Sequence, residues 1–440
     1  MYAQVAVENV NCTFDKDYDY SIPQQLEGKA LVGCRVAVPF GVGNRKRIGI
    51  ITRLTDSTQG KRIKSISAVL DEAPLLSNEM MSLARWISEQ TFCTYYEAVK
   101  AMLPAGINHK IIRSFCAVPG VDESVIASLD SDEKQVYDYL LSRSGYIKPE
   151  NFLKTLGFDV SSDIPERLLK AGLLAANDDA VRNIGDNNIR MVRLCEGSDD
   201  VSMTKKQSEV VNVLKDVGSV SVKELCYFTG YTPSVISALE KKGVVECFER
   251  EELRSFVSRY AVQSAYDSGE IHLTDEQQKA YDGLLEDYKS GTGKTALLYG
   301  VTGSGKTLVY LKLIDAVLAD NKTVIVMVPE ISLTPQTLSV FHSRYNDGVA
   351  VFHSALSAGE RADEWKRVKN GDAKIVIGTR SAVFAPLENI GLIIIDEEQE
   401  HTYKSEQTPR YNAKSVARYR AAWHKGLTLL ASATPSVESY

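Results

Sequence analysis

Residues 300 to 307 form the segment of this chain whose types and spacing are best suited to chemistry. The segment reads Gly300-Val301-Thr302-Gly303-Ser304-Gly305-Lys306-Thr307 and matches G-x-x-x-x-G-K-[ST] at every fixed position. Glycines let backbone N–H groups close around phosphates, the lysine neutralises phosphate charge, and the final hydroxyl ligates Mg²⁺. The pattern predicts a nucleoside triphosphate site with binding residues Gly300, Thr302, Gly303, Ser304, Gly305, Lys306 and Thr307.

A second group of reactive side chains follows the apolar run 392–395 and reads Asp396-Glu397-Glu398-Gln399. A carboxylate at the C-terminal tip of a buried parallel strand points into the ligand crevice of the sheet. We expect Asp396 to join Thr307 in holding Mg²⁺, and Glu397 to orient and deprotonate the attacking water. Lys306, Asp396 and Glu397 are therefore the predicted catalytic residues. The alternative is that these acids only solvate the end of a strand.

These groups can meet only if a strand leads into the glycine-rich segment and a helix leaves it. The apolar run 296–299 precedes Gly300, and apolar residues at helical spacing follow Thr307, whereas a second Gly-Lys-Thr triplet at 293–295 precedes the strand and is expected to be a linker. Further short apolar runs predict strands at 324–328, 375–377, 392–395 and 427–431. Residues 266–440 are therefore expected to form an α/β P-loop lobe of the RecA-like kind, with a parallel sheet.

The amino-acid composition limits the classes of protein to which this chain can belong. The chain has 440 residues, 44% hydrophobic and 25% charged, with a formal net charge of −6. These values suit a soluble globular chain of about two to four domains and exclude disordered, collagen-like and membrane-spanning proteins. The N-terminus lacks a secretory signal, and seven scattered cysteines form no C-x-x-C pair. We expect a cytosolic protein with reduced thiols, no membrane partner and no zinc site within this chain.

The net negative charge argues against nucleic-acid binding until it is resolved locally. Residues 35–64 contain eight basic residues and one acid, and residues 401–425 contain six basic residues and one acid. The second stretch also carries Tyr403, Tyr411, Tyr419 and Trp423. Cations interleaved with aromatic rings are typical of single-stranded nucleic acid binding. The alternative for either stretch is a solvated surface face.

The region before residue 266 is expected to contain three further domains. Residues 1–105 read as a small β-rich domain, with strands near 3–7, 35–39, 48–54 and 63–69 and a helix near 77–92. An internal repeat with an offset of about 72 residues then predicts two winged-helix-like α+β units, 106–199 and 200–265. Neither unit is basic enough to predict base readout, and a helical spacer without DNA contact is the alternative.

Together these residues resemble the first lobe of superfamily 2 helicases, and more narrowly the PriA family of replication-restart helicases. The strings that carry the resemblance are Val328-Pro329-Glu330-Ile331-Ser332-Leu333-Thr334-Pro335-Gln336, Gly378-Thr379-Arg380-Ser381-Ala382-Val383-Phe384-Ala385-Pro386, the Asp396 tetrad and Ser432-Ala433-Thr434. In the N-terminal region Tyr18-Asp19-Tyr20-Ser21-Ile22-Pro23 and Gly33–Gly41 are similar to the family's domain that grips the 3′ end of a nascent strand.

The resemblance implies roles for particular residues. Gln277 would read adenine, Arg380 would contact the DNA backbone, and Tyr403-Lys404 through Tyr411 would form an aromatic-rich loop coupling DNA binding to ATP hydrolysis. The pocket for the 3′ end would be formed by Tyr18, Asp19, Gly41 and Lys64.

The resemblance also implies an ATP- and Mg²⁺-dependent 3′→5′ helicase of the bacterial cytoplasm, associated with the nucleoid. Its partners would be forked DNA, single-stranded 3′ ends, primosome proteins and single-stranded DNA-binding protein. The full-length family also binds zinc, through cysteines that this chain does not contain.

Three features depart from the family pattern. Gln399 stands where many members have His, so coupling from the tetrad to Ser432–Thr434 would run through an amide. Two winged-helix-like units exceed the single one expected. The chain also stops at Tyr440, before a second ATPase lobe with its arginine fingers. The last feature predicts ATP binding and negligible unwinding by this chain alone, and its alternative reading is a catalytically inert fragment that binds forks and 3′ ends.

Overall fold

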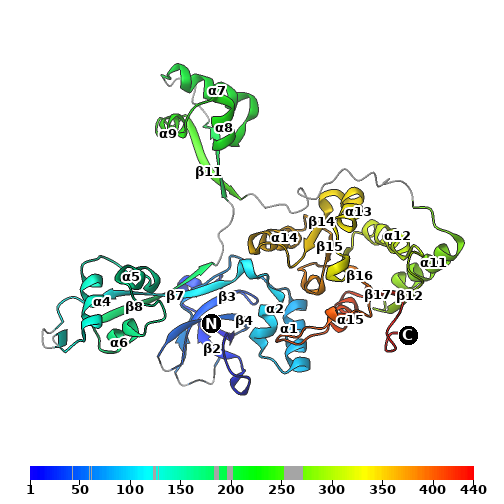
Figure 1. The fold of residues 1–440 in the computed structure, drawn as a ribbon, viewed down its shortest axis with the longest axis horizontal. Coiled ribbons are helices and arrows are strands. Elements are labelled where there is room, and N and C mark those ends of the chain that lie inside the picture. The colour runs from blue at the N-terminus through cyan, green and yellow to red at the C-terminus, as the bar shows by residue number, and fades with distance from the viewer. Residues whose placement is uncertain are drawn as a thin grey trace. The chain divides into compact units, whose positions relative to one another are not determined.

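The computed structural model describes residues 1–41, 43–58, 60, 62–121, 125, 126, 128–182, 188–195, 202–251 and 271–440 (Figure 1). The chain forms two compact units, one made of Met1–Asn183 with Tyr260–Tyr440 and the other of Ile184–Arg259. The domain boundaries predicted at residues 199 and 265 lie outside the described residues.

The N-terminal domain is built on a six-stranded sheet with strand order β5-β2-β1-β4-β3-β6. Its strands are β1 (Tyr2–Val7), β2 (Tyr18–Ser21), β3 (Arg35–Phe40), β4 (Arg45–Thr55), β5 (Lys64–Ser65) and β6 (Ala68–Val69). Side chains alternate along β1, so Ala3, Val5 and Val7 enter one core while Ala6 enters another. All four predicted strand regions are confirmed; β2 was not predicted because its residues are mostly polar.

Two helices cover the second face of this sheet. Helix α1 (Asn78–Thr91) starts where the Ser77 hydroxyl caps the Met80 amide, and α2 (Tyr95–Met102) starts at a reciprocal capping box between Thr94 and Glu97. A 3₁₀ turn, η3 (Ala105–Ile107), follows α2. The helix predicted at 77–92 is confirmed, and the Thr94–Glu97 spacing is a signal that would have located α2.

The repeat predicted from the sequence is present in the fold. The first repeat comprises β7 (His109–Ala117), α4 (Ser131–Leu141), α5 (Pro149–Leu156), α6 (Ile164–Lys170) and β8 (Leu174–Arg182). The second comprises β9 (Asn188–Leu194), α7 (Lys205–Val217), β10 (Ser219–Ser221), α8 (Val222–Thr229), α9 (Pro233–Lys241) and β11 (Val245–Glu251). In both, the first strand pairs antiparallel with the last strand and with a residue before the second helix. Each repeat also has its own apolar core.

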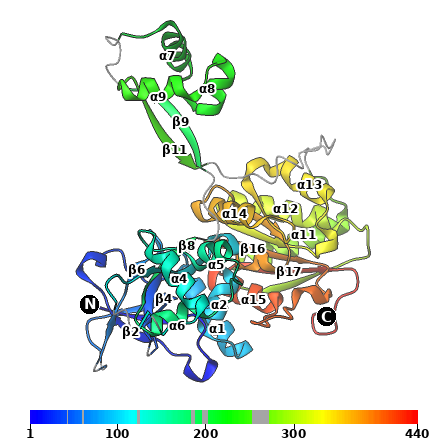
Figure 2. The ribbon, with the colours of Figure 1, turned by 60° about the vertical axis from the view of Figure 1, so that its left-hand side comes forward.

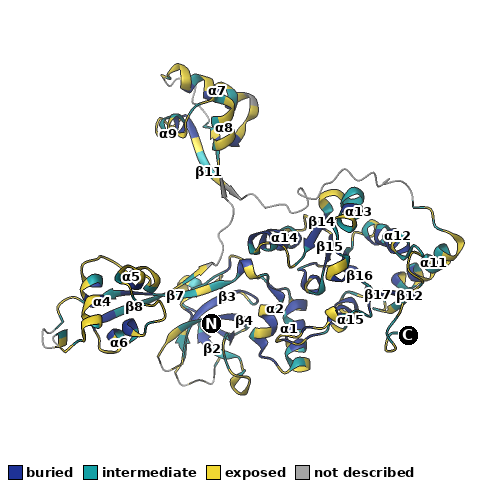
Figure 3. Cartoon of the chain, viewed as in Figure 1, coloured by how far each residue is buried: buried dark blue, intermediate teal, exposed yellow. Residues whose placement is uncertain are grey.

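The C-terminal lobe is a parallel six-stranded sheet with strand order β12-β17-β16-β13-β15-β14. The strands are β12 (Thr295–Tyr299), β13 (Thr323–Met327), β14 (Val349–Phe352), β15 (Ile375–Gly378), β16 (Ile390–Asp396) and β17 (Leu427–Ser432). Most of their residues are buried, as Figure 3 shows, because helices cover both faces. Every predicted strand of this lobe is confirmed, and β14 was missed.

One helix of the lobe precedes its first strand, and the other four connect successive parallel strands. They are α11 (Asp275–Lys289), α12 (Lys306–Ala319), α13 (Pro335–Tyr345), α14 (Ala358–Asn370) and α15 (Ala413–His424), with a 3₁₀ segment η7 (Arg380–Phe384) after β15. Helix α12 packs against β13 and β16, while α15 packs against β16 and β17, on the opposite face in Figure 2. Residues 290–294 lie outside helices and strands, as the linker prediction requires. No helix of the described residues is long and apolar enough to cross a membrane.

Candidate nucleotide and nucleic-acid sites

The glycine-rich segment joins β12 to α12 as a tight loop at the end of the sheet. Gly303 and Gly305 have φ of +81° and +77°, which only glycine adopts without strain, and a Cβ on Gly305 would lie 2.4 Å from Gln277 Nε2. Gly305 is also the N-cap of α12 and supplies no side-chain acceptor. The first N–H groups of α12 therefore face the loop, an arrangement suited to phosphate.

Lys306 lies within the predicted phosphate loop. Its ammonium donates to the carbonyl oxygens of Gly300 at 2.8 Å and Val301 at 3.3 Å. The Gly300 amide in turn donates to Ser432 O at 3.2 Å, which ties the loop to β17. The loop in which Lys306 would bind phosphate is therefore also the loop that is bonded to the end of β17.

Asp396 ends β16, two strands from β12, so the topology brings the predicted magnesium carboxylate toward the loop. Burial raises the pKa of Asp396, and the adjoining Glu397 charge adds to the increase. Tyr310 of α12 lies 3.4 Å from Asp396 Oδ2. Glu397 itself has a φ of +46°, a strained conformation for a bulky residue and one that is common at functional sites. Thr307, Asp396 and the phosphates of a bound nucleotide form an oxygen donor set of the kind that Mg²⁺ prefers.

Gln399 connects the predicted catalytic base to β17. Its amide nitrogen donates to Glu397 Oε2 at 2.9 Å, and its amide oxygen accepts from Ser432 Oγ at 2.5 Å. The Thr434 amide donates to Ser432 Oγ at 2.9 Å. The expected amide link between the tetrad and the Ser-Ala-Thr segment is therefore present.

Glu398 is a functional position that the sequence reasoning left without a role. It is fully buried and accepts from Lys414 Nζ at 2.8 Å, the Ser436 amide at 2.7 Å and Ser439 Oγ at 2.9 Å. Burial alone would raise the pKa of this carboxyl, but these donors lower it. Glu398 thus anchors the segment that follows Thr434.

Gln277 lies against the phosphate loop. Its amide oxygen accepts from the Thr274 amide at 3.0 Å, completing a capping box, and its amide nitrogen donates to Ser304 O at 2.9 Å. The contact with the loop is consistent with a nucleotide-binding position, while the reading of adenine stays a prediction.

A pocket of about 450 Å³ in the N-terminal domain, called here the N-terminal pocket, collects all four residues predicted to bind a DNA end. Lys64 Nζ donates to Gly41 O at 2.7 Å, and Asp19 Oδ2 accepts from Thr58 Oγ1 at 2.5 Å. The Tyr18 ring meets Phe40 edge to face. Its lining residues are Lys16, Asp17, Tyr18, Asp19, Tyr20, Pro39, Phe40, Gly41, Gly60, Arg62, Ile63 and Lys64.

The structure corrects the expectation that all the basic residues of 35–64 face nucleic acid. Arg35 is buried, where it pairs with Asp71 at 2.7 Å. Arg45 pairs with Glu166, Lys46 donates to Asp178 O, and Arg47 lies over the Phe40 ring. Several of these cations therefore contact other groups of the protein, although only Arg35 is buried, and within the described part of the stretch Arg62 and Lys64 line the N-terminal pocket. Lys61 lies outside the described residues.

A second hollow, of about 530 Å³, lies on the C-terminal lobe and is called here the lobe groove. Its walls carry Arg361, Arg380 and Lys404. His353 Nε2 and Arg361 Nε are buried without a hydrogen-bond partner in the described part of the chain. Orphan polar groups beside several cations suit an anionic ligand. The complete lining is Val328, Glu330, His353, Ser354, Arg361, Thr379, Arg380, Ser381, His401, Thr402, Lys404, Glu406 and Gln407.

The aromatic residues of the second basic stretch do not all face solvent. Tyr403 and Tyr411 are 1% and 8% exposed, so their rings pack in the core and are not offered for base stacking. The Tyr403 hydroxyl donates to Asp396 O at 2.6 Å, which links this loop to the end of β16. Tyr419 is half-buried and Trp423 is 49% exposed. This corrects the expectation that Tyr403 and Tyr411 present their rings to DNA.

Comparison with known proteins agrees with this division into sites. Residues 4–104 match a family model described as a 3′ DNA-binding domain, and residues 274–440 match one described as a DEAD/DEAH box helicase. The replication restart protein PriA of Bacillus subtilis is 36% identical over 447 aligned residues that cover all of this chain. The chain belongs to the PriA family. The PriA proteins of Synechocystis sp. and Chlamydia pneumoniae are 33% and 29% identical over 96% and 100% of this chain.

The chain spans about half the length of these PriA relatives, namely 54%, 51% and 49% of the three proteins. Both matched regions lie in the first compact unit, and the two repeats lie between them. Among the described residues no cluster of three or more His, Cys, Asp or Glu side chains could hold a metal ion by itself.

Sequence reasoning gave no role to Glu398, His353 or Arg361. Glu398 stands inside the tetrad, so its position was a signal, although its partners come from residues 414–439. Arg361 lies on α14 among several other charged residues, and only the fold shows that it alone of them lines the groove.

Proposed function

We propose that this chain carries the fork-binding and first ATPase parts of an ATP-dependent 3′→5′ DNA helicase that recognises stalled forks and initiates primosome assembly. The observation that carries the proposal is the presence, in one compact unit, of a phosphate loop with its carboxylates and of the N-terminal pocket. Membership of the PriA family supports the same conclusion.

The residues at the end of the sheet fit ATP and Mg²⁺. Lys306 and the first N–H groups of α12 would hold the phosphates, while Thr307 and Asp396 would hold the metal ion, which neutralises the developing charge when bound. Glu397 would accept a proton from the attacking water, and Gln399 would keep its carboxylate oriented. Gln277 would contact adenine from its place beside the loop.

The N-terminal pocket fits a terminal nucleoside. Its volume is within the range of small-molecule sites, and it combines aromatic walls with a few polar groups. Asp19 would accept a hydrogen bond from a free 3′-hydroxyl, while Arg62 and Lys64 would attract the adjoining phosphate. A 3′-phosphate would instead place a negative charge beside Asp19.

The lobe groove fits the backbone of a single strand. Arg380 and Lys404 both line the groove, and the orphan Arg361 Nε is available for phosphate oxygens, whereas His353 Nε2 lies 3.8 Å from Glu330 Oε1. The lobe groove and the ATP site share the loop after β16, because Tyr403 bonds to Asp396 O beside Lys404.

The two repeats are proposed to be winged-helix-like units. Three helices and paired strands recur in the same order in each, and neither shows a basic recognition helix. They would act as spacers or as surfaces for fork arms without reading bases. Primosome proteins, single-stranded DNA-binding protein, a zinc region beyond these residues and a nucleoid-associated bacterial cytoplasmic location are further proposals, which rest on the family.

One experiment tests the proposal. Binding affinity and ATP turnover are measured for the original protein and for Lys306→Ala. The DNA substrates are forks whose nascent strand ends in a 3′-hydroxyl or in a 3′-phosphate. We expect affinity to be higher for the 3′-hydroxyl fork, and any turnover to fall by about 100-fold or more in the variant, since the lysine stabilises transferring phosphate.

The possible results separate the alternatives. Equal affinity for the two forks would contradict binding of the 3′ end. Discrimination between the forks without any turnover would leave a fork-binding protein whose ATPase lobe is inert in this form.

A further inference from the structure

Glu79 of α1 and Arg420 of α15 form a buried ion pair between the N-terminal domain and the C-terminal lobe. Arg420 Nε donates to Glu79 Oε1 at 2.6 Å and Nη2 donates to Oε2 at 2.9 Å. The Arg420 side chain is 0% exposed and the Glu79 side chain is 4% exposed. His424, one turn further along α15, lies 3.3 Å from the same carboxylate. Both charges are therefore held out of water at this junction.

Arg420 also holds the backbone of residues 383–387, a segment that follows two residues lining the lobe groove. Its remaining N–H groups donate to Val383 O and Ala385 O at 2.8 Å and to Leu387 O at 3.2 Å. All five donors of the guanidinium are thus used. These carbonyls follow directly on Arg380 and Ser381, which line the groove. One side chain therefore connects α1 to one wall of the lobe groove.

Another part of the groove lining is attached at a second point. A Cβ on Gly106 of η3 would lie 2.0 Å from Ala358 O and 2.8 Å from Ala362 Cβ, so only glycine permits this approach to α14. Helix α14 carries Arg361 into the lobe groove. Two segments that line the groove, one on α14 and one before residues 383–387, are therefore attached to the N-terminal domain.

The N-terminal pocket is connected to the same junction through β3. At one end of this strand Arg35 pairs with Asp71 and donates to Ile107 O at 2.7 Å, which holds η3. At the other end Pro39, Phe40 and Gly41 line the N-terminal pocket. The strand is six residues long and is paired on both sides, so it acts as a stiff connection.

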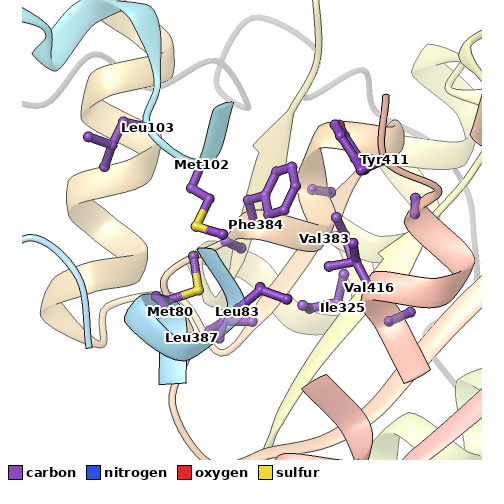
Figure 4. Packing of buried hydrophobic residues seen from close by; sticks show 14 of the residues in the cluster. Met80, Leu83, Met102, Leu103, Ile325, Val383, Phe384, Leu387, Tyr411 and Val416 are labelled. Carbon is purple, nitrogen blue, oxygen red and sulfur yellow. The ribbon is translucent and has the colours of Figure 1, made fainter. Parts of the chain in front are cut away.

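A continuous apolar core fills the space between these attachments. Figure 4 shows Met80, Leu83 and Met102 of the N-terminal helices among Val383, Phe384, Leu387, Tyr411 and Val416 of the lobe. The Trp86 ring lies 5.1 Å from the Tyr419 ring at the same junction. Close-packed cores of this kind resist continuous deformation.

We propose that Glu79 and Arg420 are positioning residues that keep the N-terminal pocket at a fixed distance from the lobe groove, so that the protein measures the single-stranded gap between a nascent 3′ end and the strand held by the lobe. This inference rests on the proposed function. Two sites held at a fixed spacing bind one DNA molecule best when the DNA spans that spacing.

The test is the dependence of affinity on gap length. Forks with a 3′-hydroxyl are lengthened one nucleotide at a time, and binding is measured for the original protein and for the double variant Glu79→Leu with Arg420→Met. The double variant removes both charges and leaves neither of them buried alone. We expect the original affinity to vary by about tenfold with a defined maximum, and the variant profile to flatten to within about threefold.

Controls separate positioning from folding. Affinity for an isolated 3′-hydroxyl strand should change by less than about twofold in the variant, because neither site is altered. Glu166→Gln is the control, since it removes a carboxylate charge that pairs with Arg45 and Arg113 away from the junction, and it should keep the maximum. If the double variant does not fold, Arg420→Lys, which keeps the charge but loses most contacts to the three carbonyls, should broaden the profile.

Two results would overturn specific claims. An unchanged maximum in the folded junction variants would overturn the positioning role of Glu79 and Arg420. No dependence on gap length or on the 3′-hydroxyl in the original protein would instead overturn the proposed function.

Discussion

At the scale of residues, the protein places several carboxylates out of water and gives each a different partner. Glu398 is held by Lys414 and by donors from 436–439, and Glu79 by Arg420. Asp396 is half-buried and has no bonded cation among the described residues, so desolvation raises its pKa, whereas burial of the other two is outweighed by their donors. The carboxylate that we propose as a metal ligand thus differs electrostatically from the two that hold the fold together.

The Glu79 carboxylate should make the stability of the junction depend on pH. Burial alone would raise its pKa, but Arg420 and His424 lower it to about 2 from an ordinary value of 4.5. A lowered folded-state pKa gives stability that is present above pH 4.5 and is lost as pH falls toward 2, about 3 kcal/mol in all. The difference in unfolding free energy between the original protein and Glu79→Gln, measured with urea at several pH values, should shrink over this range. If the unfolding free energies of the two proteins changed in parallel with pH, the lowered pKa of Glu79 would be contradicted.

At the scale of elements, α15 contacts both the tetrad that follows β16 and the domain junction. Lys414 in its first turn bonds Glu398, and Arg420 near its end bonds Glu79. Its outer face carries the half-buried Tyr419 and the exposed Trp423, which stack with ring centroids 6.5 Å apart. This helix therefore carries the rings of the second basic stretch that can still meet a base.

The exposed ring of α15 leads to a prediction about single-stranded DNA. Trp423→Ala should weaken binding by about 1–3 kcal/mol, the usual effect of removing a stacking ring. Tyr403→Phe should leave binding unchanged and lower stability by about 1 kcal/mol, because it removes only buried hydroxyl bonds. Fluorescence titration and thermal unfolding of the two variants would measure these effects. A larger loss of binding for Tyr403→Phe would instead support the original expectation that the Tyr403 side chain contacts DNA.

The outcome at this scale shows what a sequence can and cannot predict. The strands of the C-terminal lobe were predictable because buried parallel strands are short apolar runs between helices. The phosphate loop was predictable because its residues are contiguous. Glu79 and Arg420 were not predictable, since 341 residues separate them and each looks like an ordinary charge on a helix. Burial of Tyr403 and Tyr411 was missed because alternation of rings and cations does not show which rings enter a core.

At the scale of the whole molecule, the net charge of −6 does not show that the basic residues are divided between contacts within the protein and surfaces that can meet DNA. Part of the first basic stretch joins the N-terminal domain to the first repeat, through Arg45 with Glu166 and Lys46 with Asp178. Another part lines the N-terminal pocket. The number of cations that meet DNA is therefore smaller than the sequence count.

The salt dependence of binding should show this division. Arg62→Ala should reduce the slope of log affinity against log salt by about 0.7, the value for one phosphate contact on a single strand. Arg45→Ala is the matched control and should leave the slope unchanged, because its partner is Glu166. Binding to a 3′-hydroxyl strand across a series of salt concentrations gives both slopes. An equal reduction in the two variants would contradict the assignment of Arg45 to an ion pair with Glu166 rather than to DNA.

The tandem repeat has a consequence for how such a chain can change over generations. Each repeat has its own apolar core, and its first and last strands lie side by side, so its two ends emerge close together. A copy with these properties can be gained, lost or exchanged by recombination without opening the core of its neighbour. The second repeat, which forms a compact unit by itself, is therefore the segment in which relatives can differ most in length while keeping the remainder of the chain intact.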